Sequence, residues 1–371
     1  NPQITFFKVV YRRHTNFSME CIEQTLNGTA GYGNTVTATV SRNGDLVGKM
    51  HIEYVQSNND ATATANPGSA LIDYVELEIG GQLIDKHYGH WLEVYAELTQ
   101  PNSDGCNPLC ADVAINSSDA TSWTSFQRMS GMGGVKGATD TMERLFMPLQ
   151  FFFNRNPGLA LPLIALQYHE VKVKIAIQTE SLSGGNSTFG STFKLWADYI
   201  YLDTDERRRF AQVSHEYLIE QVQFQSFSTS TSHDLNFNHP VKELIWTGGI
   251  TASAGAQAGS STPKAFSTPD TTWKLVLNGH DRFAEQNTKY FSRYQVNQFH
   301  TGFGSINVVD TICVYSFALK PEEHQPSGTC NFSRIDNAQL KVGATTAVYV
   351  YAVNYNVLRV MSGMGGLAYS N

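Results

Sequence analysis

A short charged segment near the middle of the chain separates two stretches with strand-like alternation. Before it, apolar residues recur at every second position, the pattern of a half-buried β-strand, at Phe193, Leu195, Ala197, Tyr199 and Tyr201. After it, residues 217–224 return to a β-rich composition. We therefore predict an N-terminal β unit at residues 1–203, a linker at 204–215 and a C-terminal β unit at 216–371.

The charged segment itself has the pattern of a short capped helix. Asp203 is the expected N-cap, and Glu206 stands three residues later, as in a capping box. Arg207, Arg208 and Arg209 follow as a cationic run, which either is solvated or contacts the neighbouring β unit or another subunit. These five residues are the predicted inter-domain joint.

Length and charge exclude some classes of protein. At 371 residues the chain exceeds the roughly 250–300 residues that one hydrophobic core supports, so two domains are expected. The net charge of −7 gives no general attraction to phosphate backbones, which argues against direct nucleic-acid binding. The longest apolar run, Leu159 to Leu166, contains Pro162 and is too short to span a bilayer. No signal peptide is visible.

The cysteines predict neither a disulfide framework nor a metal site. There are five, an odd number spread over a long chain, and this favours a reducing compartment. Cys106 and Cys110 form the one close pair, but no second Cys/His pair at zinc-finger spacing accompanies them. Two thiols in a polar loop are therefore favoured, and neither a cofactor nor a metal is expected.

Alternating segments in the first half predict antiparallel sheets. Residues 35–40 and 49–54 alternate, and Asn43-Gly44 between them favours a positive-φ turn, so a hairpin is expected here. The best amphipathic helix pattern runs from His87 to Leu98 and predicts a lid on one end of a β-sandwich. Roughly eight short strands precede the joint, the number found in a jelly roll.

The second half repeats this pattern. The strand, turn and strand at 274–283 echo those at 76–85, with Asn278-Gly279 in the place of Gly80-Gly81. Later strands are expected at 312–319, 338–342 and 347–353. Long loops are expected at 99–141 and 248–270. The hexapeptide Met-Ser-Gly-Met-Gly-Gly occurs at 129–134 and at 361–366, in positions that are not equivalent in the two halves, and the sequence alone does not explain it.

No catalytic constellation stands out. His87, His90 and Glu93 are spaced as a ligand triplet on the expected helix but lack a fourth partner, so packing and surface roles are favoured. Glu76 and Glu78 share one face of a strand and form a candidate glycosidase pair, but solvent-facing carboxylates on any antiparallel sheet show the same pattern. These carboxylates keep a carbohydrate-binding or carbohydrate-active β-sandwich protein as the alternative function. Candidate glycosylation sequons begin at Asn16, Asn27, Asn116, Asn186 and Asn331.

Several long blocks resemble the major capsid protein of large icosahedral double-stranded DNA viruses, particularly the algal-virus type. They include NPQITFFKVVYRRHTNF at the start, VELEIGGQLIDKHY at 75–88, NPGLALPLIALQYHEVK at 156–172, FALKPEEHQPSGTCNFSRIDNA at 317–338 and NYNVLRVMSGMGGLAY at 354–369. These blocks, together with the joint, run from one end of the chain to the other.

The resemblance implies a double jelly roll, with two tandem eight-stranded antiparallel barrels and short helices in the loops. It also implies a homotrimer that forms a pseudo-hexagonal capsomer, and capsomers that tile an icosahedral shell around an internal membrane. The expected partners are further copies of the chain, minor capsid proteins and that membrane, and the expected location is the virion after assembly in the host cytoplasm. Assembly, and no enzymatic activity, is the expected function.

Overall fold

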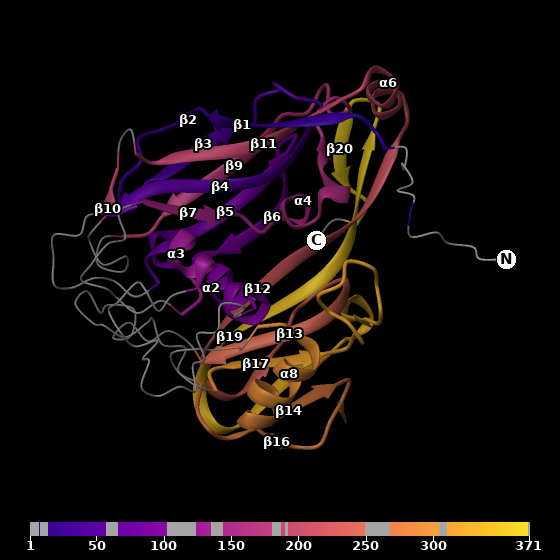
Figure 1. The fold of residues 1–371 in the computed structure, drawn as a ribbon. Helices are drawn as coiled ribbons and strands as arrows, with labels where there is room; N and C mark the ends of the chain where they lie inside the picture. The colour runs from indigo at the N-terminus through magenta and orange to yellow at the C-terminus, as the bar shows by residue number, and fades with distance from the viewer. Residues whose placement is uncertain are drawn as a thin grey trace.

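The computed structural model of the chain is an all-β molecule with short helices at the ends of its strands (Figure 1). It describes residues 7, 14–56, 66–101, 124–134, 144–179, 187–189, 192–248, 268–302, 304 and 310–369. Residues 1–6 and 8–13, Cys106 and Cys110, and most of the two expected long loops lie outside these residues. No helix among the described residues is long and apolar enough to cross a membrane.

The N-terminal barrel consists of two antiparallel sheets. Its strands are β1 (Phe17–Gln24), β2 (Leu26–Asn27), β3 (Thr35–Thr39), β4 (Leu46–Gln56), β5 (Ile72–Ile79), β6 (Gln82–Tyr88), β7 (Arg144–Pro148), β8 (Leu161–Pro162), β9 (Val171–Ile177), β10 (Ser187–Thr188) and β11 (Lys194–Leu202). One sheet has the order β1-β11-β4-β10, with β7 and β8 also paired to β4, and the other has the order β2-β3-β9-β5-β6. Their inward residues share one apolar core.

The C-terminal barrel is one continuous sheet that folds around a second core. Its strands are β12 (His215–Asp234), β13 (Pro240–Gly248), β14 (Thr272–Leu277), β15 (His280–Asp281), β16 (Gln286–Asn287), β17 (Ile312–Ser316), β18 (Cys330–Asn331), β19 (Ala338–Met361) and β20 (Met364–Leu367). The order β15-β14-β19-β13-β17 forms its main path, and β12 pairs with β19. Trp246, Trp273 and Phe291 fill the middle of this core.

Short helices connect the strands of both barrels. They are α1 (Pro67–Leu71), α2 (Gly89–Thr99), α3 (Ser125–Ser130), α4 (Phe152–Arg155), η2 (Pro157–Leu159), α6 (Thr204–Gln212), η3 (Tyr290–Gln295), α8 (Val296–Phe299) and η4 (Phe332–Arg334). The helix predicted from His87 begins at Gly89, because His87 still belongs to β6. A Cβ on Gly89 would lie 2.0 Å from the carbonyl oxygen of Ile72, so only glycine allows α2 to begin this close to β5.

The hairpin predicted around Asn43-Gly44 is wrong. β3 lies in the five-stranded sheet and pairs with β9, whereas β4 lies in the other sheet and pairs with β11. The connection therefore crosses from one sheet to the other, and Gly44 is not among the residues with positive φ. Glycine is needed there for a different reason, since a Cβ would approach the Cβ of Tyr199 to 2.8 Å.

Two strands are longer than the sequence pattern predicts. Residues 338–342 and 347–353, expected as separate strands, are parts of the 24-residue β19. The 20-residue β12 pairs with it from His215↔Val360 to Asp234↔Gln339, with register shifts between Phe227 and Ser232. Such irregularities let one strand bend and continue. The small residues at 343–347 interrupt the alternation of apolar and polar residues, and the pattern therefore predicted two strands.

The predicted echo between the halves is present in the backbone. Gly80 and Gly81 have φ of 59° and 83° in the turn between β5 and β6. Asn278 and Gly279 have φ of 50° and 79° in the turn between β14 and β15. Positive φ at both central positions is the geometry of a type I′ hairpin turn.

Candidate functional site: the interface between the two barrels

An apolar layer joins the two barrels at the helix α2, which lies between them in Figure 1. One face of α2 places Leu92 and Ala96 in the N-terminal core. A second face forms a separate cluster with the C-terminal sheet, made up of Trp91, Val94 and Leu98 from α2 and Ile245, Val296, Ile312, Val314, Tyr351 and Val353 from the sheet and α8. The helix is therefore apolar on two sides because it serves two cores.

Hydrogen bonds fix the register of this interface. The amide of Gly302 donates to the carbonyl of Leu98 at 2.7 Å, and the amide of Gly304 donates to that of Glu97 at 3.0 Å. At the other end of α2, His90 Nδ1 lies 2.6 Å from the hydroxyl of Tyr351. Backbone bonds of this kind fix how two elements sit against each other, in addition to the apolar area that they bury.

A buried ionic triad lies beside the apolar layer. Arg155 at the end of α4 contacts Glu220 of β12 at 2.9 Å, and Lys242 of β13 contacts the same carboxylate at 2.8 Å. The side chains of Glu220 and Lys242 are 6% and 3% exposed. Because two cations share one largely buried carboxylate, loss of Glu220 would remove the ion-pair partner of both.

A second charged cluster surrounds His300 just after α8. Its Nε2 is 3.1 Å from Glu243 and its Nδ1 is 3.1 Å from Glu322, and its side chain is 2% exposed. Burial alone lowers the pKa of His300, but the two carboxylates outweigh burial and raise the pKa to about 9. His300 is therefore a buried cation at neutral pH.

The His300 cluster predicts a loss of stability at alkaline pH. The pKa of His300 is higher in the folded state than in the unfolded state, so protonated His300 stabilises the fold. This stabilisation is complete below about pH 6.5 and disappears as the pH rises through about 9. The expected loss is about 3 kcal/mol in the free energy of unfolding, measured by urea denaturation across this pH range. His300→Gln should remove this part of the pH dependence, and an unchanged profile in that variant would contradict the assignment.

The first copy of the repeated hexapeptide holds a buried carboxylate of α2. The amides of Gly133 and Gly134 donate to Glu93 Oε1 at 3.0 and 2.8 Å, and Ser69 Oγ donates to its other oxygen at 2.8 Å. Burial raises the pKa of Glu93, and these hydrogen bonds only partly offset it. Gly131, Gly133 and Gly134 all have positive φ, which explains the need for glycine in this copy.

The second copy of the hexapeptide forms the turn between β19 and β20. Ser362 and Gly363 have φ of 55° and 81°, and Met361 pairs with Met364 across them. The carbonyl of Gly363 accepts a hydrogen bond from the amide of Tyr168 in the N-terminal barrel at 2.9 Å. Leu358 and Val360 also belong to the N-terminal core, so the end of the C-terminal barrel is anchored in its neighbour.

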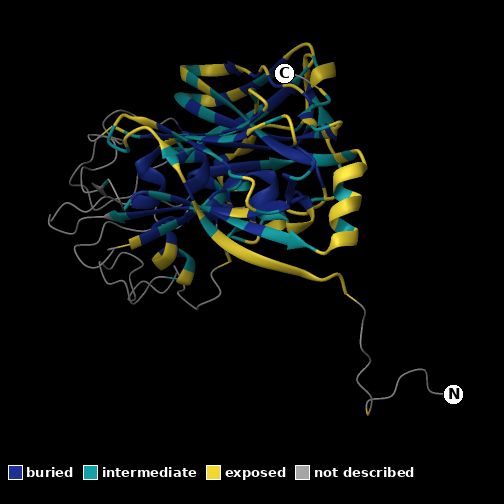
Figure 2. Ribbon diagram, turned by 90° about the horizontal axis from the view of Figure 1, so that it is seen from above, coloured by how far each residue is buried: buried dark blue, intermediate teal, exposed yellow. Residues whose placement is uncertain are grey.

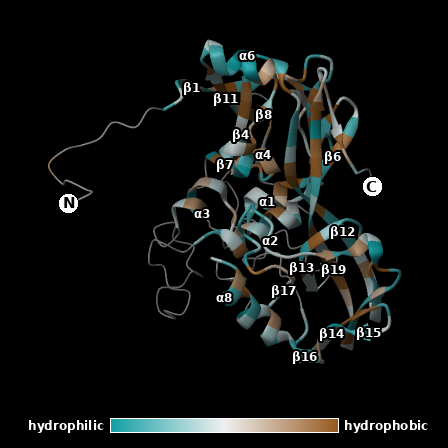
Figure 3. Ribbon diagram, turned by 90° about the vertical axis from the view of Figure 1, so that its right-hand side faces the viewer, coloured by the Kyte–Doolittle hydropathy of each residue, from teal (hydrophilic) through white to brown (hydrophobic). Residues whose placement is uncertain are grey.

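The predicted joint is the exposed helix α6, none of whose residues is buried (Figure 2). Most of this helix is hydrophilic (Figure 3). Asp203 is its N-cap, as predicted, but its side chain accepts from the first helical amide, that of Thr204, rather than forming a capping box with Glu206. Arg207 contacts Asp45 at 2.9 Å, which ties the helix to the N-terminal barrel. Arg208 and Arg209 are exposed.

The candidate catalytic residues and metal ligands each contact a different partner. His87 contacts Asp85 at 2.8 Å, His90 lies against Tyr351, and Glu93 accepts amide hydrogens, so the three do not converge. Within the described ranges, no group of three His, Cys, Asp or Glu side chains could hold a metal ion. Glu76 and Glu78 each pair with a lysine, Lys86 and Lys174, on the outer face of their sheet.

The sequon asparagines differ in accessibility. Asn16 and Asn27 are exposed, near β1 and in β2. Asn331 is half-buried, and its side-chain oxygen accepts a hydrogen bond from the amide of Ser333. Asn116 and Asn186 lie outside the described residues.

The ionic triad and the His300 cluster were not predicted from the sequence. Arg155, Glu220 and Lys242 come from three separate segments, and none of them belongs to a periodic pattern of charges. The available signal was the pair of charged residues Lys242 and Glu243 within the largely apolar strand β13.

Comparison with protein families matches nearly the whole chain. The family described as "Major capsid protein N-terminus" matches residues 5–203, and "Large eukaryotic DNA virus major capsid protein" matches residues 206–366. The chain is 50% identical to the major capsid protein of Pyramimonas orientalis virus, over all of this chain and 95% of that protein. It is 43% identical to the major capsid protein of Paramecium bursaria Chlorella virus 1, with the same coverage.

Solved structures agree with these matches. The chain is similar to a chain of the structure titled "PBCV-1 virus capsid, quasi-atomic model", with a TM-score of 0.78, 40% identity and coverage of 99% of this chain and 100% of that one. The Faustovirus major capsid protein has a TM-score of 0.69 at 13% identity, which supports the fold alone. The predicted double jelly roll is thereby confirmed.

Proposed function

The chain belongs to the major capsid protein family of large eukaryotic DNA viruses, and from this premise we propose that three copies associate into a pseudo-hexagonal capsomer. The protein is a structural component of an icosahedral viral capsid and not an enzyme. The observation that carries the trimer is the similarity to a capsid chain over essentially the full length of both chains. Six barrels in one trimer would give a unit able to tile a hexagonal lattice.

The proposed division of the chain is a barrel at 1–203, a linker at 204–215 and a barrel at 216–371. Separate sheets and separate apolar cores on either side of α6 support it. The contacts of Leu358 and Val360 with the first core support a rigid connection between the barrels rather than independent domains. A rigid pair of barrels suits a capsomer, because its outline then does not depend on a hinge.

The proposed partners beyond the capsid lattice are minor capsid proteins and an internal membrane beneath the shell, without direct contact to nucleic acid. The net charge of −7 supports the last point, since phosphate contacts are dominated by cations. Assembly is proposed in the host cytoplasm, and the free thiols of Cys21, Cys313 and Cys330 are consistent with a reducing compartment. If glycans are attached at sequons, Asn16 and Asn27 are the most accessible of those described.

The trimer is tested by light scattering of the purified chain at two protein concentrations and moderate salt. We expect a concentration-independent mass of three times 41.1 kDa. An obligate interface buries enough apolar surface that dilution over a modest range should not dissociate it. A monomer at both concentrations would contradict the proposal.

A further inference from the structure

The two barrels contain equivalent sheets. In the N-terminal barrel the antiparallel order is β1-β11-β4-β7, and in the C-terminal barrel it is β12-β19-β13-β17. In both, alternate residues face the barrel's own core and the remaining residues form an outer face. The two outer faces can therefore be compared position by position.

The outer face of the C-terminal sheet is covered within the chain. Ile245 of β13, Val314 of β17 and Tyr351 of β19 point outward and are at most 1% exposed, because α2 packs on them. The side chains that cover them are Trp91, Val94 and Leu98. In this molecule, then, such a sheet face is buried under a helix that follows a hairpin of the other barrel.

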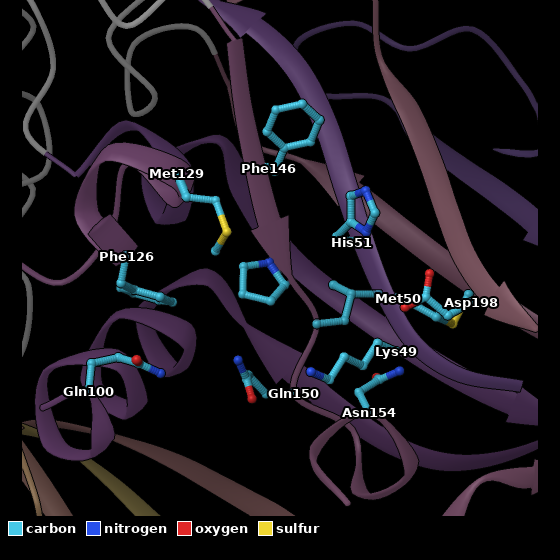
Figure 4. Close-up of a pocket in the computed structure, with 12 residues that line it drawn as sticks. Lys49, Met50, His51, Gln100, Phe126, Met129, Phe146, Gln150, Asn154 and Asp198 are labelled. Atoms are coloured by element: carbon cyan, nitrogen blue, oxygen red, sulfur yellow. The ribbon is translucent and has the colours of Figure 1, made fainter. Parts of the chain in front are cut away.

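The outer face of the N-terminal sheet has no such cover among the described residues. Met19 of β1 is 56% exposed, and Trp196 of β11 and Phe146 of β7 are only half-buried. A groove of about 540 Å³ continues from this face to α3, where Met129 is 41% exposed. In Figure 4, Met129 and Phe126 stand on one side of the groove, and Phe146 and His51 on the other.

Among the described residues, the helix equivalent to α2 also keeps an exposed face. α2 follows the hairpin β5–β6, and η3–α8 follows the equivalent region β14–β16, after a turn of the same geometry. Phe291 of η3 points into the C-terminal core, but Tyr294 is 59% exposed and Arg293 and Asn297 are exposed beside it. In the part of the chain that the structure describes, a sheet face of the N-terminal barrel and a helix face of the C-terminal barrel are therefore both open to solvent.

We propose that η3–α8 of a second copy packs on the outer face of the β1-β11-β4-β7 sheet, with Tyr294 directed into the groove beside Met129. The contact repeats between copies the arrangement that α2 makes within each copy. It is heterologous, since different surfaces of the two copies meet, and such contacts close into rings when the rotation allows. Tyrosine is a preferred anchor in pockets of this kind. The inference rests on the proposed self-association and specifies the surface that performs it.

The smaller apolar content of the open face fits a contact formed after folding. The covered C-terminal face is lined by Ile245, Val314 and Tyr351, whereas the open face also carries Lys49, His51 and Asp198. Surfaces that must remain soluble before association combine an apolar centre with polar residues. This difference is expected between a fold-internal interface and one between subunits.

The test introduces a charge on either surface. Met129→Glu and Tyr294→Glu should each raise the concentration at which half of the trimers dissociate by at least tenfold, measured by light scattering on a dilution series. Tyr168→Glu is the matched control, because Tyr168 is 76% exposed beside the β19–β20 turn and lines neither surface. Far-UV circular dichroism should show that all three variants keep the β-rich fold of the wild type.

Cysteine cross-linking tests the direction of the contact. A chain with Met129→Cys mixed with a chain with Tyr294→Cys, both also carrying Cys21→Ser, should give a disulfide-linked dimer after oxidation that neither chain forms alone. A Met129→Cys chain that cross-links to itself would overturn the heterologous contact. Wild-type trimers that neither charged variant weakens would overturn the surface assignment and leave the capsomer standing, whereas a monomeric wild-type chain would overturn both.

Discussion

Glu220→Ala should lower the free energy of unfolding by about 3–5 kcal/mol, because it removes the carboxylate partner of the buried ammonium of Lys242 and of the largely buried guanidinium of Arg155. Arg155 and Lys242 both contact this carboxylate within 3 Å, and the side chain of Lys242 is 3% exposed. In the low-dielectric interior, an unpaired ammonium costs more than the original pair contributed. Urea denaturation at neutral pH, with tryptophan fluorescence as the signal, measures the effect.

The same strand offers a matched control. Glu216 of β12 pairs with Arg359 at 2.8 Å, but both side chains are more than 60% exposed. Glu216→Ala should therefore change the free energy of unfolding by less than about 1 kcal/mol. If the two substitutions had equal effects, the triad would not be the buried unit described above.

A further variant separates the charge from the packing. Replacing Arg155, Glu220 and Lys242 together with methionine removes all three charges while keeping much of the side-chain volume. Buried ionic groups replaced by apolar ones are often tolerated or even stabilising, so this variant should be much closer to the wild type than Glu220→Ala. We therefore expect that removing one member of the triad lowers the free energy of unfolding strongly, whereas replacing all three members changes it little.

The strands could be predicted from the sequence far better than their partners. β9 shows why, since Val171, Val173 and Ile175 are buried and the lysines between them are half-buried, as the alternation indicated. The alternation of apolar and polar residues indicates which face of a strand is buried, but it does not indicate which other strand pairs with that strand. The turn at Asn43-Gly44 therefore looked like a hairpin, although the chain crosses there between two sheets.

The interface was only partly predictable for a related reason. The apolar spacing of Trp91, Val94 and Leu98 identified a helix, and its prediction as a lid on one barrel was incomplete because α2 also packs on the other barrel. The charged clusters left no periodic signal, since their members come from segments far apart in the chain. The family resemblance supplied the double jelly roll, but not the residues that hold its two barrels together.

Trp91→Ala should destabilise the protein by about 3–5 kcal/mol and loosen the two barrels from each other. The indole is 2% exposed and lies 5.0 Å from the ring of Tyr351, between α2 and the C-terminal sheet. Truncation leaves a cavity in the layer that joins the barrels and none in either barrel core. Thermal unfolding should therefore broaden or divide into two transitions, whereas we expect one transition for the wild type.

Trp273→Ala is the control that separates loosening of the contact between the barrels from a general loss of stability. Trp273 is 0% exposed but lies in the C-terminal core, so its loss should cost a similar free energy without weakening the contact between the barrels. Limited proteolysis at the exposed helix α6 should be faster in Trp91→Ala than in Trp273→Ala under conditions where both are folded, because only the first variant lets the barrels separate around the joint. Equal cleavage rates would mean that the long β12–β19 pair and the anchored β20 turn hold the barrels together without α2.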